Sequence, residues 1–340
     1  MKTTDAKIKK WQLLRCRFRG EIADLTEVDF IAVGKRAFYR KKRLEEVLLP
    51  DSASAIKTDA FAKCKRLKKI TLPSNTSVGL ANGAFSGCRR LQTVENMQMI
   101  SLIGARTFAD CRMLTDVTFG QELRKIGEEA FCGCTSLRSL TLPSSIQTLG
   151  RAAFAGCTEL ARVEMEAGMD ATAADLFRGC ISLSDVTLSP LWTEIAKGTF
   201  RECSALLEIT VPSQIQRIGK KAFLGCARLS SVTLEHGVTR IDASAFAKTP
   251  RLKEIIVPSS LKRLGFGAFG LGKTDEKAVM YVENEYMVRR MKRLLLLCGS
   301  WGRVRVEQSG KTLAERKRER HRTSLEQDPV HLIDRSMSDN

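Results

Sequence analysis

One feature constrains the fold of this chain more than any other: phenylalanine recurs at a fixed interval. Eleven of its 15 phenylalanines are spaced 23 residues apart, with a single interval of 24. They are Phe38, Phe61, Phe85, Phe108, Phe131, Phe154, Phe177, Phe200, Phe223, Phe246 and Phe269. A fixed period of this length is typical of repeat architectures, in which each unit packs only on its neighbours. The sequence therefore predicts an elongated stack of similar coils.

Other apolar positions keep the same period. Leucine stands six residues after the repeat phenylalanine in ten coils, and an aliphatic residue stands nine residues after it, as in Leu137 and Leu140. Apolar alternation at the end of this segment predicts a short strand with one buried face. A proline such as Pro143 often ends the strand, and an aliphatic–glycine pair such as Leu149–Gly150 allows a bend. One coil cannot bury its own apolar face, so we expect the coils to share one core.

Eight of the 11 cysteines follow the period, each three residues after a repeat phenylalanine. They are Cys64, Cys88, Cys111, Cys134, Cys157, Cys180, Cys203 and Cys226. Because free cysteine is among the most buried residue types, we expect an interior ladder whose thiols donate weak hydrogen bonds to backbone carbonyls of neighbouring coils. Adjacent coils are close enough for disulfides by distance alone, but reduced structural thiols are the favoured interpretation. The row contains no C-x-x-C pair and indicates no metal site.

The repeat resembles that of the BspA-type, or treponemal, class of leucine-rich repeat. Residues 137–157 (LRSLTLPSSIQTLGRAAFAGC) and 206–226 (LLEITVPSQIQRIGKKAFLGC) match its repeat unit nearly letter for letter. The resemblance implies a repeat solenoid, a right-handed superhelix of about eleven coils, with a parallel β-sheet on one face and a short helical or irregular convex side. It also implies binding of other macromolecules, and many members of the class are exported surface proteins.

Departures from the period divide the chain into four parts. Residues 1–30 are expected to cap the first coil with an amphipathic helix and a shortened first strand over 25–30. Residues 31–275 carry the repeats. Residues 276–307 are expected to form a strand–helix–strand cap, and residues 308–340 form a basic tail without apolar periodicity. The two caps would cover the open ends of the array, which it needs for solubility.

The net charge of +18 lies mostly at the two ends, and the middle of the chain is nearly balanced. A nucleic-acid groove along the whole solenoid would be basic throughout. The basic ends are instead candidates for docking to RNA or to an anionic membrane, and the tail could equally be a solvated segment. The candidate docking residues are Arg40, Lys41, Lys42, Arg43, Lys65, Arg66, Lys68, Arg316, Lys317, Arg318 and Arg320.

The sequence indicates a compartment only indirectly. The N-terminal segment has no apolar run of signal-peptide length, and no run elsewhere has the length of a membrane span. We expect a cytoplasmic protein with reduced cysteines, or a nuclear one directed by the basic tail. A surface or adhesin-like protein is a further alternative that would require another export route.

Catalytic patterns are missing from the sequence. Only three histidines are present, and none belongs to a recognisable Ser/His/Asp or Cys/His arrangement. Residues 267–274 match the P-loop pattern, but no buried strand leads directly into them and no long helix is predicted after them. We therefore expect no enzymatic activity, no cofactor, no metal and no small-molecule substrate.

The expected function is protein binding by a monomeric scaffold or adaptor. The outward side of the sheet is the expected surface, because threonine recurs ten residues after the phenylalanine and charges of both signs recur eight residues after it. Threonine also favours strands, so its row has a structural role as well. Mixed charge without aromatic residues argues against nucleic acid on this face. The candidate residues are Lys69, Thr71, Asp116, Thr118, Thr141, Arg162, Asp185, Thr187, Glu208, Thr210 and Thr233.

Overall fold

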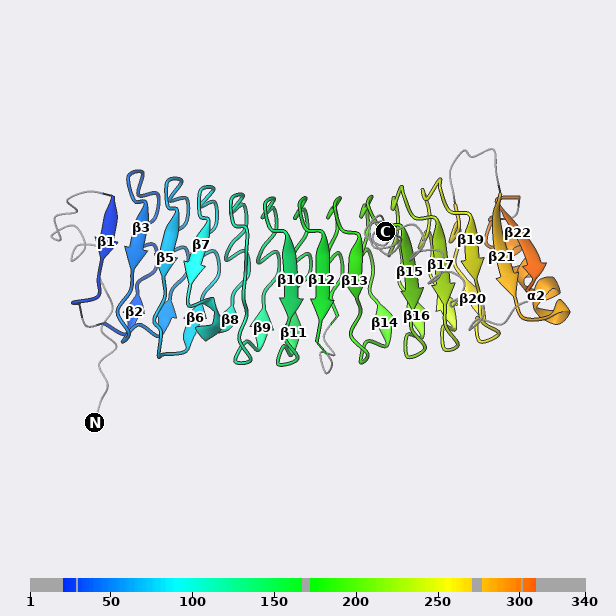
Figure 1. Cartoon of the computed structure of the whole chain (residues 1–340), viewed down its shortest axis with the longest axis horizontal. Helices are drawn as coiled ribbons and strands as arrows, with labels where there is room; N and C mark the ends of the chain where they lie inside the picture. Colours follow the sequence, from blue (N-terminus) through cyan, green and yellow to red (C-terminus); the bar gives the residue numbers. More distant parts are fainter. Residues whose placement is uncertain (1–20, 29, 167–171, 271–276, 301, 310–340) are drawn as a thin grey trace, which may run out of the picture.

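The structure, a computed structural model, describes residues 21–28, 30–166, 172–270, 277–300 and 302–309. These residues form an elongated solenoid of about twelve turns (Figure 1). Several expectations lie outside the described residues. They are residues 1–20 of the amphipathic helix expected within 1–24, the second half of the P-loop-like pattern, and the basic tail with Arg316, Lys317, Arg318 and Arg320. The end of the expected helix is wrong, because residues 22–24 form a strand.

The wider of two rows of parallel strands follows the leucine-rich part of each repeat. Strand partners lie one repeat apart, as in the register Leu140–Val163–Val186. Leu140 and Val163 are buried, whereas Arg162, which directly precedes Val163, is exposed. One face of the row therefore points into the core. The row consists of three sheets, ordered β1-β3-β5-β7, β10-β12-β13 and β15-β17-β19-β21-β22. Its strands are β1 (Ile22–Asp24), β3 (Glu46–Leu48), β5 (Lys69–Thr71), β7 (Thr93–Glu95), β10 (Ser139–Leu142), β12 (Arg162–Met165), β13 (Asp185–Thr187), β15 (Glu208–Val211), β17 (Ser231–Leu234), β19 (Glu254–Ile256), β21 (Ala278–Val282) and β22 (Val304–Gln308).

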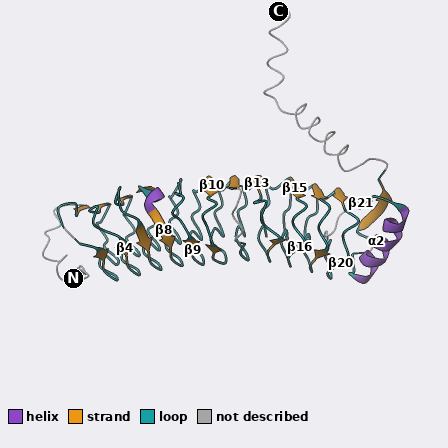
Figure 2. Cartoon of the chain, turned by 90° about the horizontal axis from the view of Figure 1, so that it is seen from below, coloured by secondary structure: helices purple, strands orange, loops and turns teal. Residues whose placement is uncertain are grey.

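A second, narrower row of strands makes the expectation of a sheet on one face incomplete. It occupies a different side of the solenoid from the wider row (Figure 2). Each short strand ends on the aliphatic residue that precedes the repeat position held by glycine in most coils, where the sequence indicated only a bend. The row contains two sheets, ordered β11-β9-β8-β6-β4-β2 and β14-β16-β18-β20. Its strands are β2 (Ala32–Val33), β4 (Ala55–Ile56), β6 (Val78–Leu80), β8 (Ile100–Ile103), β9 (Lys125–Ile126), β11 (Thr148–Leu149), β14 (Glu194–Ile195), β16 (Arg217–Ile218), β18 (Arg240–Ile241) and β20 (Arg263–Leu264).

The first strand lies earlier in the chain than the sequence suggested. The expected strand over 25–30 is wrong, because β1 pairs Ala23 with Val47 and Asp24 with Leu48 of β3. Leu25 follows β1 and is buried, as Leu49 is after β3. Leu25 therefore takes the last apolar position of the strand motif, whereas the sequence pattern predicted that it takes the first position. The exposed side chain of Val28 agrees with this shift of register.

The third side of each coil is a turn that carries the repeat phenylalanine. All eleven rings are fully buried, and successive rings stack with centroids 4.7 Å apart for Phe38–Phe61 and up to 5.9 Å apart for Phe154–Phe177. The turns also pair through their backbones. The N–H of Phe131 donates to the carbonyl of Ala153 in the next coil at 2.7 Å. Each ring from Phe61 to Phe246 thus lies between two others, and the coils are held at a nearly constant spacing.

Two residues in each turn from Phe38 to Phe246 adopt a left-handed backbone. In the turn of Phe131 they are Glu129 (φ 52°) and Gly133 (φ 74°), two residues before and two residues after the ring. Glycine takes this conformation at no steric cost, whereas a residue with a Cβ pays roughly 1–2 kcal/mol. Lys248 (φ 57°) occupies the second position in the turn of Phe246, so the chain tolerates strain there.

The cysteine row forms the expected ladder. All eight thiols are buried, and each donates to the carbonyl oxygen of the phenylalanine in the preceding coil. The contact from Cys134 Sγ to Phe108 O, at 3.2 Å, is representative. The ladder cysteines form no disulfides. Each of these carbonyls also accepts a backbone N–H within its own turn, as Phe108 O does from Cys111 at 3.0 Å, so the thiol adds a second, weak hydrogen bond to it.

The C-terminal end of the described solenoid is covered by β21, helix α2 (Glu285–Leu297) and β22. Asn284 caps the helix by accepting the N–H of Met287 at 3.0 Å. Met287, Met291 and Leu295 are buried on the face of α2 turned toward the last strands. Figure 2 shows α2 across this end of the stack. Among the described residues, no helix combines the length and the apolar character needed to cross a bilayer.

The ladder thiols should resist alkylation in the folded protein. Burial raises the pKa of the Cys64 and Cys226 thiols to about 12, and the thiolate is the form that reacts with iodoacetamide. Cys132 lies off the ladder and is half-buried, so among the described cysteines it should react first. Mass spectrometry of peptides from protein treated at pH 8 would measure this order. The prediction is wrong if the ladder cysteines of the native protein react as fast as Cys132 and as fast as they do in protein unfolded with guanidinium.

A glycine should relieve the strain in the turn of Phe246. Lys248→Gly is expected to raise the free energy of unfolding by about 1 kcal/mol, because the left-handed conformation then costs nothing. The matched opposite change is Gly156→Ala. Its added Cβ would have no neighbour closer than 3.8 Å, so the expected loss of similar size comes from φ alone. Urea denaturation of both variants checks the prediction, which fails if Lys248→Gly is destabilising.

Candidate functional site

The residues expected to form a binding face lie on the wider row of strands. Lys69 and Thr71 are on β5, Arg162 is on β12, and Asp185 and Thr187 are on β13. Thr141 on β10, and Glu208 and Thr210 on β15, are also exposed. The face is divided, however, because these strands belong to three separate sheets. It does not form one continuous sheet surface.

The charges on this face pair with one another. Lys69 Nζ lies 2.8 Å from Glu95 Oε1, and the hydroxyl of Thr71 donates to Glu95 Oε2 at 2.6 Å. The hydrogen bond from Lys69 lowers the pKa of the Glu95 carboxyl, and the one from Thr71 adds to this effect. Arg162 and Asp185 form a second pair at 2.8 Å. Most of the charge that a partner could recognise here is already compensated within the face.

Three of the expected residues depart from a strand on an exposed face. Asp116 and Thr118 are exposed but lie in a segment without strand structure. There Phe119 packs edge-on against Phe131, with centroids 5.8 Å apart. The assignment of Thr233 to the exposed face is wrong. This residue stands in register between Thr210 and Ile256, and only 1% of its surface is exposed, so it offers no contact to a partner.

The basic residues of the first coils divide into paired and unpaired groups. Arg66 and Lys68 both contact the Glu45 carboxylate at 2.6 Å. The guanidinium of Arg40 lies 5.3 Å from the centre of the Tyr39 ring. In the described part of the chain no ion pair is formed by Lys41, Lys42, Arg43 or Lys65. The structure therefore brings these candidates to one end of the solenoid, with part of their charge compensated.

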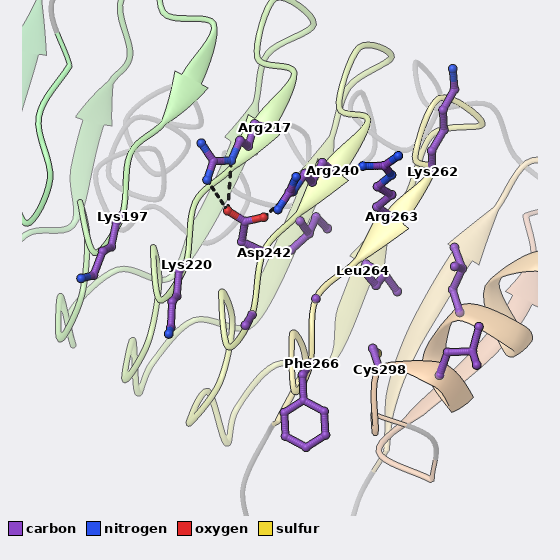
Figure 3. A pocket seen from close by; sticks show the side chains of 15 residues that line it. Lys197, Arg217, Lys220, Arg240, Asp242, Lys262, Arg263, Leu264, Phe266 and Cys298 are labelled. Carbon is purple, nitrogen blue, oxygen red and sulfur yellow. Dashed lines mark hydrogen bonds and ion pairs between the residues drawn. The ribbon is translucent and has the colours of Figure 1, made fainter.

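A different surface combines charge with a hollow. Between the sheet β14-β16-β18-β20 and helix α2 lies a cavity of about 730 Å³, which we call the C-terminal groove (Figure 3). Six basic side chains and one carboxylate line it together with apolar side chains. The lining residues are Lys197, Arg217, Lys220, Arg240, Ile241, Asp242, Ala243, Lys262, Arg263, Leu264, Gly265, Phe266, Leu294, Leu297 and Cys298.

Three arginines of the groove form a row on successive strands. Arg217, Arg240 and Arg263 pair in register on β16, β18 and β20. In β-strands successive side chains point to opposite faces, so the residue after each arginine turns inward. Ile218 and Ile241 are fully buried, which leaves the arginines on the outer face. The repeat thus places one guanidinium per coil along the groove.

Asp242 fixes two of these arginines. Its side chain is 9% exposed and accepts from Arg217 Nη2 at 2.7 Å and from Arg240 Nε at 2.5 Å (Figure 3). Burial would raise the pKa of the Asp242 carboxyl, but the hydrogen bonds and charges of Arg217 and Arg240 outweigh it and hold the pKa below its usual value. Arg217 also contacts Glu194 at 3.0 Å. The carboxylate therefore orients guanidinium groups at the wall of the groove.

Asp242 is the single acidic residue at its repeat position, which glycine holds in six of the eleven coils. Gly219 and Gly265 hold the same position in the coils on either side. A Cβ at Gly219 would lie 2.8 Å from the backbone of Ala196 in the preceding coil, so this position faces a close neighbour. The Asp242 side chain is largely buried, and a buried carboxylate needs charged partners, which the two arginines supply.

The remaining basic side chains of the groove are uncompensated. Within the described residues, Lys197, Lys220, Lys262 and Arg263 have no ion-pair partner, although each is exposed. Apolar groups adjoin them at the end nearest α2. Phe266 is 77% exposed and Leu297 is 71% exposed, and Leu264 is half-buried. The N–H of Gly267 donates to Cys298 O at 2.7 Å and ties the last turn to the end of α2.

The groove offers recognition of an anionic and partly apolar group. In the part of the chain that the structure describes, no three histidine, cysteine or acidic side chains cluster as metal ligands would. We missed the groove in the sequence, although its signal is periodic. Arg217, Arg240 and Arg263 are 23 residues apart, and Asp242 replaces the glycine of the aliphatic–glycine pair.

Comparisons with known proteins fit this architecture. The model of the BspA type leucine rich repeat region matches residues 31–161 and 159–273, with six copies. Among solved structures, a leucine rich cell surface protein from Faecalibacterium prausnitzii is similar over 86% of this chain and 88% of its own, with 21% identity and a TM-score of 0.53. A leucine-rich repeat protein from Bacteroides ovatus is 20% identical over 85% of this chain and 92% of its own, with a TM-score of 0.44. The T. pallidum leucine rich repeat protein is 28% identical over 55% of this chain and 78% of its own, with a TM-score of 0.41.

No match to this chain is found among the curated proteins. The F. prausnitzii similarity supports the solenoid fold, and the family match carries the assignment to a family. The two matched segments cover well over half of the 340 residues and include all the repeat phenylalanines. The chain therefore belongs to the BspA-type leucine-rich repeat family.

Proposed function

We propose that this chain is a non-enzymatic protein-binding module, a scaffold or adaptor, and that its partner docks in the C-terminal groove. The observation that supports this most is the set of four uncompensated basic side chains beside exposed apolar ones, at a hollow of about 730 Å³. Interfaces are typically built from such arrangements, with an apolar centre and a polar rim. Rigid stacked coils present these groups with little loss of conformational freedom on binding.

The outward face of the wider row of strands, which we call the wide face, is the second candidate surface. Thr141, Thr187 and Thr210 are exposed there, but Lys69, Arg162 and Asp185 on the same face are paired. The groove is favoured because a partner gains more from a charge that has no ion pair than from one that must first be released.

Docking of RNA or an anionic membrane through the basic ends is the alternative. In the first coils Glu45 already holds Arg66 and Lys68, which weakens that alternative at this end. A cytoplasmic location suits the reduced ladder thiols. The F. prausnitzii protein is described as a cell surface protein, so a surface role for this chain is the competing interpretation.

Charge reversal in the groove should remove the partner. We expect Lys262→Glu/Arg263→Glu to retain several-fold less of the proteins that the wild-type chain captures from nuclease-treated lysate, at about physiological and about half-molar salt. Within the described parts of the chain, neither residue has an ion pair that the change would break. Quantitative mass spectrometry of the captured proteins measures the loss.

A matched control exists within the repeat. Arg124 and Lys125 hold the same two repeat positions, at β9, outside the groove. Arg124→Glu/Lys125→Glu should capture the same proteins as the wild type. If both double variants behave alike, the groove is not the docking site. Loss of capture in Thr141→Arg/Thr187→Arg instead would point to the wide face. Proteins that the wild type captures from untreated but not from nuclease-treated lysate would point to nucleic acid.

A further inference from the structure

We infer that the C-terminal groove binds an extended acidic peptide segment of a partner protein, with one large apolar side chain of that segment packed against Phe266 and Leu297. The inference rests on the proposed function and adds the chemistry of the partner to it. It follows from three properties of the groove: the spacing of its cations, the arginines fixed by Asp242, and the apolar groups at one end.

The cations of the groove are spaced to match an extended chain. Arg240 and Arg263 stand on adjacent coils in register, and the neighbouring rings of Phe246 and Phe269 place these coils 5.3 Å apart. Side chains on one face of an extended peptide recur at intervals of about 6.6 Å. Long arginine and lysine side chains absorb the difference of about one ångström. Acidic residues at alternate positions of a peptide can therefore meet one cation per coil.

Asp242 prepares the groove for such a peptide. It holds Arg217 and Arg240 in place (Figure 3), and Glu194 supplies a second carboxylate to Arg217 but none to Arg240. Arg240 contacts Asp242 through Nε and lines the groove together with Arg263, which has no ion-pair partner among the described residues. A guanidinium that is already oriented loses less freedom when it binds a second carboxylate.

The apolar end of the groove gives the segment a register. Phe266 projects from the turn after β20 (Figure 3), and a Cβ at Gly299 would lie 3.2 Å from its ring, so the ring lies against the end of α2. Together with Leu297 it exposes apolar surface next to the cations. Exposed apolar groups of this kind mark interaction sites, and a single buried aromatic or aliphatic anchor often dominates an interface.

The same features favour a peptide over nucleic acid. In the register of the narrow row the arginines are preceded by Glu194 on β14, so the basic track is short. Its other end meets α2 and apolar side chains. Among the described residues, Phe266 is the one aromatic side chain lining the groove, whereas non-specific single-strand binding relies on a longer positive track with several stacking rings.

Fluorescence anisotropy with the full-length chain tests the inference. The first probe is a short labelled peptide that alternates glutamate with serine and carries one phenylalanine. In the second probe serine replaces the phenylalanine, and in the third glutamine replaces every glutamate. An oligouridylate of equal charge is the fourth probe. We expect the first peptide to bind about tenfold more tightly than the second or the third, and more tightly than the oligouridylate.

The variants assign the binding to the groove. Lys262→Glu/Arg263→Glu should weaken the first peptide at least about tenfold, and Phe266→Ser should abolish its advantage over the second peptide. Arg124→Glu/Lys125→Glu should stay within about twofold of the wild type. Equal thermal unfolding of all variants shows that the fold is kept. Tighter binding of the oligouridylate, or peptide binding that ignores the groove variants, would overturn the inference.

The outcome separates this inference from the function on which it rests. If Lys262→Glu/Arg263→Glu loses its lysate partners but the acidic peptide does not bind, the partner chemistry is wrong and docking in the groove stands. If lysate capture is unchanged by the same variant, docking in the groove is wrong whatever the peptide does.

Discussion

A single coil of this solenoid has no interior of its own, so every other property depends on contact between neighbouring coils. The phenylalanine stack is the centre of that contact, because each ring covers the apolar faces of the rings above and below it. Hydrogen bonds run both ways between the coils. The turn N–H of Phe131 donates forward to Ala153, whereas the N–H of Gly127 and the thiol of Cys134 donate backward to Ile103 and Phe108. A coil is therefore fixed by both neighbours, and order spreads along the axis from contact to contact.

The strict period made much of this fold predictable. The phenylalanine core, the cysteine ladder and the strand that ends near Leu142 all follow from residues that repeat at one spacing. A contact that recurs in every coil requires the same type of residue at the same position of each repeat. The first strand was misplaced for the opposite reason. Outside the repeats, Leu25 fits two positions of the strand motif, and only the pairing of Ala23 with Val47 decides between them. The narrow row was missed because its strands are too short to show alternation.

The candidate site illustrates a different limit. Which charges on a surface are available depends on which are already paired, and pairing is a property of distances between coils. Lys69 and Lys262 look alike in the sequence, yet Glu95 holds the first and no described acid holds the second. Asp242 was visible as a break in the glycine row, but its meaning required the two arginines that converge on it. A departure from a repeat is thus as informative as the repeat itself.

The cap at the C-terminal end has a consequence for how such a protein can change. Because α2 is joined to the last turn through Gly267 and Cys298, the groove and its arginines form one unit at the end of the array. Duplication or loss of a whole 23-residue coil farther toward the N-terminus would leave that unit intact. It would lengthen or shorten the molecule by one ring-to-ring step, 4.7 Å between Phe38 and Phe61. The number of coils then sets the distance between the groove and the opposite end of the solenoid.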